Sequence, residues 1–105
     1  GSIPWMAPEV ITGSGSGRRA DIWSFGCVLI EMATASTPWG KLDNPMAAMM
    51  KIGMSKEVPQ MPVEGISEDC RSFAEACLQR DKTKRPYADA LLAYPFVDGL
   101  LLDDM

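Results

Sequence analysis

The segment from residue 20 to residue 33 is apolar on every side of the helix that it would form, with only Asp21, Ser24 and Glu31 as polar exceptions. A helix without a polar face has to be surrounded by protein. The segment is too short and too interrupted to span a membrane, so it predicts the central helix of a globular domain. Wrapping it on all sides needs more chain than the remaining residues comfortably supply. The pattern therefore favours a piece of a larger domain.

Composition limits the classes of protein that the chain can belong to. Its 105 residues are 47% hydrophobic and 23% charged, which is typical of one globular unit and not of a disordered segment. The formal net charge of −4 offers no positive field for nucleic acid or for anionic membranes. The sequence shows neither a spanning apolar run nor a signal peptide, so we expect a cytoplasmic protein.

The cysteines predict neither a disulfide framework nor a zinc site. Cys27, Cys70 and Cys77 are odd in number without a close pair, and the chain has no histidine to complete a set of metal ligands. Cys70 and Cys77 are placed on one face of a helix by their spacing. We expect them to be small buried hydrophobic side chains.

Turn and capping residues divide the chain into short helices, and strand-like alternation is nowhere sustained. A short helix is expected over residues 8–11, followed by a glycine-serine surface loop at 13–17. Ser67 is placed to cap a further helix, and Pro86 to begin a last one over about 87–93. The helix after Ser67 has an apolar stripe made of Phe73, Ala74, Cys77 and Leu78.

The region between these helices contains a turn and a group of methionines. Residues 36–40 predict a turn that buries Trp39, and Asn44-Pro45 predicts the start of a helix reaching about Met54. Methionine is flexible and polarizable, so a cluster of it suits either irregular core filling or an adaptable docking surface. Both alternatives stay open for Met46, Met49, Met50 and Met54.

Three motifs follow one another in a fixed order: Trp-Met-Ala-Pro-Glu at 5–9, Asp-Ile-Trp-Ser-Phe-Gly at 21–26, and Arg85-Pro86. Together they resemble the C-terminal lobe of a eukaryotic serine/threonine protein kinase. Within that family the chain looks most like the MAP kinase kinase kinases. The resemblance covers residues 1–97 and leaves 98–105 as a tail. It implies a mainly α fold, the helical lobe without the N-terminal β lobe.

The resemblance also implies a structural clamp between Glu9 and Arg85. The planar fork of arginine can satisfy both oxygens of a carboxylate at once. The alternative is two unrelated surface charges. Asp21 matches an aspartate that accepts hydrogen bonds from the backbone of the catalytic loop in kinases; it can equally be a plain acidic residue at the start of a helix.

Residues Ser2, Ile3, Pro4 and Trp5 match the part of the family that binds the protein substrate. The hydroxyl of Ser2 stands where relatives hold the catalytic aspartate and favours serine or threonine substrates. Ile3 and Pro4 depart from the usual residues there. Ser2 can instead be a phosphorylation target or a residue without a role.

Complete relatives transfer the γ-phosphate of ATP to protein serine or threonine with the help of Mg²⁺. The present sequence has no glycine-rich phosphate loop, no His-Arg-Asp and no Asp-Phe-Gly, so we predict that it holds no catalytic, cofactor or metal residues and is inactive alone. The partner implied for the parent is a MAP kinase kinase. The alternative function is a non-catalytic binding module that uses residues 45–54 and the opening segment.

Overall fold

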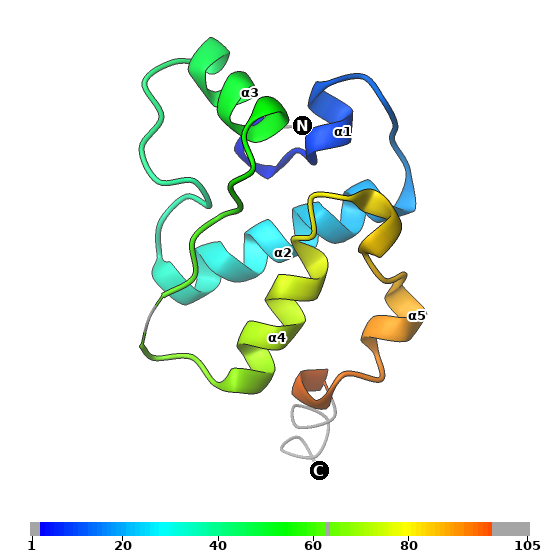
Figure 1. The fold of residues 1–105 in the computed structure, drawn as a ribbon. Helices are drawn as coiled ribbons and strands as arrows, with labels where there is room; N and C mark the ends of the chain where they lie inside the picture. Colours follow the sequence, from blue (N-terminus) through cyan, green and yellow to red (C-terminus); the bar gives the residue numbers. More distant parts are fainter. Residues whose placement is uncertain (1–2, 63, 98–105) are drawn as a thin grey trace.

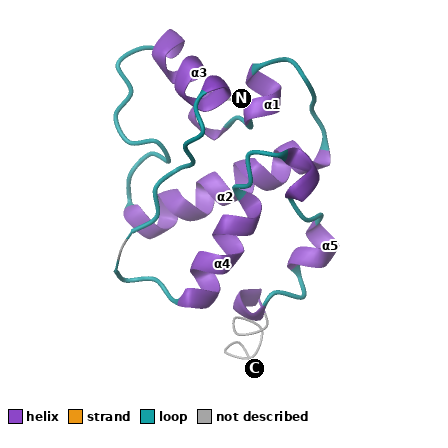
Figure 2. Ribbon diagram, in the orientation of Figure 1, coloured by secondary structure: helices purple, strands orange, loops and turns teal. Residues whose placement is uncertain are grey.

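The computed structural model describes residues 3–62 and 64–97, and within these ranges it consists of helices and loops without any strand (Figures 1 and 2). The prediction of a mainly α fold is therefore confirmed. The expected tail at 98–105 lies outside the described residues. In chain order the elements are the 3-10 turn η1 (Ile3–Trp5), α1 (Pro8–Ile11), α2 (Arg18–Thr34), α3 (Pro45–Met54), α4 (Glu68–Cys77), the 3-10 turn η2 (Lys82–Lys84) and α5 (Ala88–Leu91).

Helix α2 is the longest element and runs through the middle of the molecule, with α1 and α3 on one side and α4 and α5 on the other (Figure 1). It begins before the predicted Ala20 because Gly17, with φ of 113°, turns the chain into the helix. It ends at Thr34, and its C-cap Ala35 adopts the left-handed conformation at φ 55° and donates its N–H to Glu31 O at 2.8 Å.

The core lies where α2 crosses α4. Trp23, Cys27 and Phe73 are all buried there, and the Trp23 ring stacks on Trp39 with 6.4 Å between ring centroids. The crossing needs a residue without a side chain at Gly26. A Cβ added at Gly26 would lie 2.8 Å from Cys77 Cβ, closer than such atoms approach in proteins. The burial predicted for Trp39 is confirmed.

The described residues leave part of the surface of α2 uncovered. The sequence predicted a helix that needs more wrapping than this chain supplies. Ile22 and Trp23 are buried, whereas Phe25 and Met32 are 51% and 76% exposed. The elements that pack on α2 therefore leave a part of its surface open, including the side chains of Phe25 and Met32.

Helix α3 begins and ends where the sequence predicted. Its N-cap Asn44 accepts a hydrogen bond from Ala47 N at 2.8 Å, and its buried side is made by Ala48 and Ile52. Gly53 lets α3 approach α1, since a Cβ there would lie 3.0 Å from Ile11 Cγ2. The four methionines are on the exposed side, so the core alternative is wrong for them. We call this surface the methionine face of α3; it comprises Met46, Met49, Met50 and Met54.

The predicted cap of α4 is confirmed, and the last helix is shorter than expected. Ser67 Oγ accepts from Cys70 N at 3.1 Å, and the four residues of the predicted apolar stripe are all buried. Helix α5 covers only Ala88–Leu91, because Tyr87 is extended and acts as its N-cap. The chain then places Tyr94 and Phe96 against Phe73, with ring centroids 5.8 Å and 5.4 Å apart.

Candidate functional site

The site is organised by an ion pair that joins the two ends of the chain. Glu9 lies in the first turn of α1, and Arg85 follows η2. Arg85 Nη2 donates to Glu9 Oε1 at 2.7 Å and Nη1 donates to Oε2 at 2.7 Å. The two parallel bonds are the bidentate geometry in which a guanidinium fits a carboxylate. The alternative of two unrelated surface charges is wrong.

The guanidinium of Arg85 has a partner for each of its five N–H groups. Besides Glu9, it donates to three backbone carbonyls: Gln79 O at 2.6 Å, Arg19 O at 2.8 Å and Arg80 O at 3.2 Å. Its carbon lies 5.2 Å from the centroid of the Trp23 ring. Arg85 is 1% exposed. A buried charge is tolerated only with such complete pairing, so this residue ties α1, α2 and the end of α4 together.

Glu9 is held as a carboxylate. Burial on its own would raise the pKa of Glu9, but the hydrogen bond from Arg85, a backbone hydrogen bond and the positive charges of Arg85 and Lys82 together outweigh that effect and lower its pKa. The pair is therefore ionised at neutral pH and acts as a structural connection, not as a source or acceptor of protons.

The predicted substrate-binding residues Ile3, Pro4 and Trp5 form η1, which lies against α2. Two hydrogen bonds between Trp5 and side chains of α2 hold this turn in place. Ser24 Oγ donates to Trp5 O at 2.7 Å, and Trp5 Nε1 donates to Glu31 Oε1 at 3.2 Å. The turn is therefore fastened to the central helix through both the backbone and the side chain of Trp5.

The anchoring residues Ser24 and Glu31 were not among the predicted site residues. The available signal was their polarity, because they are two of the three polar side chains on an otherwise apolar helix. Polar groups on such a helix need hydrogen-bond partners. Nothing in the spacing indicated that the partner would be Trp5.

Two further residues were predicted for the site, Ser2 and Asp21. Ser2 lies outside the described residues. Asp21 is exposed in the first turn of α2, where a carboxylate interacts favourably with the helix dipole. Among the described residues no hydrogen-bond donor contacts its side chain. The role implied by the resemblance thus stays a prediction.

The cysteines are free. The burial predicted for Cys77 is confirmed, whereas Cys70 is only half-buried. Burial raises the pKa of the Cys27 thiol and of the Cys77 thiol to about 12, so both are protonated at neutral pH. Within residues 3–62 and 64–97, acidic and cysteine side chains nowhere gather in a group of three or more that could hold a metal ion. In the same part of the chain no helix is both long and apolar enough to cross a membrane.

Comparison with known proteins gives the same family as the motifs. The protein kinase domain matches residues 1–97. The chain is 44% identical over 100 residues to mitogen-activated protein kinase kinase kinase A of Dictyostelium discoideum, covering 95% of this chain and 10% of that protein. It is 46% identical over 98 residues to mitogen-activated protein kinase kinase kinase 3 of Arabidopsis thaliana, covering 92% of this chain and 16% of that protein.

A third relative, mitogen-activated protein kinase kinase kinase nsy-1 of Caenorhabditis elegans, is 46% identical over 99 residues, with 92% of this chain and 6% of that protein covered. The chain thus spans a small part of the length of the curated relatives it matches. With the domain match extending over residues 1–97 and the Glu9–Arg85 ion pair in place, this chain belongs to the protein kinase domain family.

Proposed function

We propose that this chain is the C-terminal part of a serine/threonine kinase of the MAP kinase kinase kinase type, acting in the cytoplasm on a MAP kinase kinase. The complete enzyme would transfer the γ-phosphate of ATP, with Mg²⁺ neutralising the phosphate charge. The observation that carries the proposal is the Glu9–Arg85 ion pair, which fixes α1 directly after the segment that resembles a substrate-binding site.

The contribution of these residues is to position the protein substrate. In this proposal Ser2, Ile3, Pro4 and Trp5 contact the substrate around its phosphorylated residue. Ser24 and Glu31 hold Trp5 on α2, so that this residue does not have to be ordered when substrate binds.

The open side of α2 supports a larger domain. Phe25 and Val28 expose 51% and 41% of their surface beside Met32, although the helix resembles a buried central element. We propose that the catalytic part of the parent kinase covers these side chains and that its catalytic loop bonds to Asp21. The present sequence lacks the motifs for ATP and Mg²⁺, so we infer that the chain alone is inactive.

A chimera tests this proposal. The chain replaces the matching segment of the Dictyostelium kinase, and transfer of labelled phosphate to an ATP-site-inactivated MAP kinase kinase is measured. We expect the chimera to phosphorylate serine or threonine, and the chain alone to transfer nothing. A chimera that unfolds cooperatively like its parent but is inactive would contradict the proposal, as would transfer by the chain alone.

A second candidate function is a non-catalytic binding module, and the methionine face of α3 favours it. Met46 and Met54 are 67% and 76% exposed, which suits an adaptable contact surface. The test is binding of the chain alone to a MAP kinase kinase by titration calorimetry, with Met46→Ser/Met50→Ser as the variant. Equal binding by the chain and this variant would argue against the second function.

A further inference from the structure

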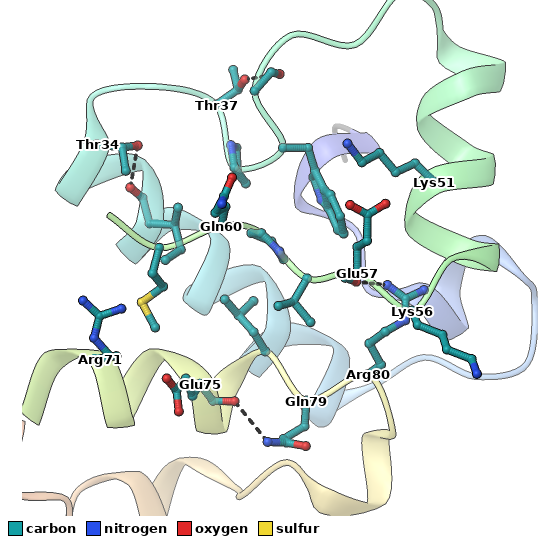
Figure 3. Close-up of a pocket in the computed structure, with 18 of the residues that line it drawn as sticks. Thr34, Thr37, Lys51, Lys56, Glu57, Gln60, Arg71, Glu75, Gln79 and Arg80 are labelled. Carbon is teal, nitrogen blue, oxygen red and sulfur yellow. Dashed lines mark hydrogen bonds between the residues drawn. The ribbon is translucent and has the colours of Figure 1, made fainter. Parts of the chain in front are cut away.

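A pocket with a volume of about 1030 Å³ lies between the loops that follow α2 and α3 and the exposed side of α4 (Figure 3). Its lining includes neither η1 nor Glu9 and Arg85, although the backbone carbonyls of Gln79 and Arg80, two lining residues, accept hydrogen bonds from Arg85. Lys51 and Glu57 reach it from α3 and the loop after it, while Arg71 and Glu75 stand on α4 opposite (Figure 3). None of the kinase motifs accounts for it.

The charge of this pocket is opposite to that of the chain. The whole chain has a formal net charge of −4, yet the pocket is lined by more basic than acidic residues. The acidic ones are Glu57, Glu75 and Asp81. The basic ones are Lys51, Lys56, Arg71, Arg80 and Lys84.

Part of this positive charge has no carboxylate in direct contact within the described part of the chain. Arg80 donates to the backbone carbonyls of Ile52 and Glu57, which fixes the loop after α3 without cancelling the charge. Among the described residues, no carboxylate lies at salt-bridge distance from Arg80, Lys51 or Lys84. Of the acidic residues, Asp81 accepts from Thr83 N at 2.9 Å and from Thr83 Oγ1 at 2.7 Å, which orients its carboxylate and leaves it charged.

The apolar part of the pocket surface sets a second requirement for a ligand. Trp39, Pro59 and Leu78 line it and are largely buried, whereas Val58 is 45% exposed. The Lys51 ammonium lies 5.9 Å from the centroid of the Trp39 ring, an arrangement that holds the charge beside the apolar surface. A ligand that fits has to present carboxylates and an apolar side chain together.

We propose that this pocket binds an acidic segment of a partner protein, with an apolar side chain against Val58 and Trp39 and carboxylates facing Lys51, Lys84 and Arg80. Complementary charge would guide the segment to the pocket, and apolar contact would hold it there. The proposal does not depend on phosphoryl transfer, because binding requires only the described surface.

The test is fluorescence anisotropy of the complete 105-residue chain with a fluorescein-labelled peptide of aspartate and leucine. The matched probes replace aspartate by asparagine, by lysine or by phosphoserine. The NMR signal of the Trp39 indole N–H reports whether the peptide is in the pocket. This signal is assigned as the one that is missing from the spectrum of Trp39→Phe. We expect the aspartate peptide to bind most tightly and to shift that signal.

The variant Lys51→Gln/Lys84→Gln should weaken binding by roughly tenfold, as expected for the loss of two partly exposed charge contacts. Arg18→Gln/Lys41→Gln removes the same total charge from exposed positions outside the pocket and should change affinity less than about twofold. Equal loss in both variants would overturn the proposal. So would equal binding of the asparagine peptide, tighter binding of the lysine or phosphoserine peptide, or an unmoved Trp39 signal.

Discussion

The Glu9–Arg85 ion pair and the methionine face of α3 represent two opposite ways of using side chains. The ion pair is buried, directional and complete, since the guanidinium has five donors and five bonds. The methionine face is exposed, and its side chains have no directional partners. Directional contacts require particular residue types in a particular geometry, so a sequence motif can reveal them. An apolar pattern is compatible with several packing arrangements, so the structure is needed to show which side chains are buried.

Removing the ion pair should have the largest effect. We expect Arg85→Ala to lower the free energy of unfolding by about 3–5 kcal/mol, because it leaves the Glu9 carboxylate buried without a partner. Chemical unfolding followed by near-UV circular dichroism measures this. The neighbouring exposed Lys84→Ala is the control and should stay within about 0.5 kcal/mol. Similar losses in the two variants would show that the pair has no special role.

The two sides of α3 should respond differently to truncation. Ile52→Ala should cost about 2–5 kcal/mol, since Ile52 is 0% exposed and its removal leaves a cavity. Met50→Ser should change stability by no more than about 0.5 kcal/mol. Thermal unfolding of both variants is the measurement. A large loss for Met50→Ser would mean that the methionine face is packed after all.

The crossing of α2 and α4 can be tested at Gly26. At an open helix position, alanine in place of glycine gains about 1 kcal/mol. At Gly26 we expect instead a net loss of about 1–3 kcal/mol, because the added Cβ meets the Cys77 Cβ. Equilibrium unfolding in urea gives the sign. A more stable Gly26→Ala variant would contradict the observed helix crossing.

Lowering the pH should weaken the ion pair, with a smaller effect than removing a partner. The pKa of Glu9 is lowered from 4.5 in the folded chain, so its contribution is fully present above that value and is lost as the pH falls through the folded pKa. We expect the stability of Glu9→Gln to depend less on pH below about 4.5 than that of the unchanged chain. Identical pH profiles from urea unfolding would show that Glu9 is not the group involved.

The order of the helices, the Ser67 cap and the Glu9–Arg85 contact could all be predicted from the sequence, because each depends on local chemistry or on a recognisable motif. The hydrogen bonds between Trp5 and the side chains of Ser24 and Glu31 could not, since no recognised motif links these positions. The length of α5 was also missed. There, packing of the residues after the helix on Phe73 prevails over local helix propensity.

The uncovered surface of α2 shows what the sequence could indicate only in general terms. An apolar helix predicts burial, but the pattern does not say which chain segment provides it. Phe25 and Met32 are exposed within the described residues. The sequence thus indicated that α2 has to be covered, and the structure shows which of its side chains are left exposed.

The most direct test of the account is a double-mutant cycle on Glu9→Ala and Arg85→Ala, with the free energy of unfolding measured for all four chains in urea. If the ion pair joins the two ends of the chain, the double variant will lose less stability than the two single variants lose together. The difference should be about 0.5–3 kcal/mol, because the double variant leaves neither charge buried alone. Additive losses would mean that the two residues act independently and would contradict the account.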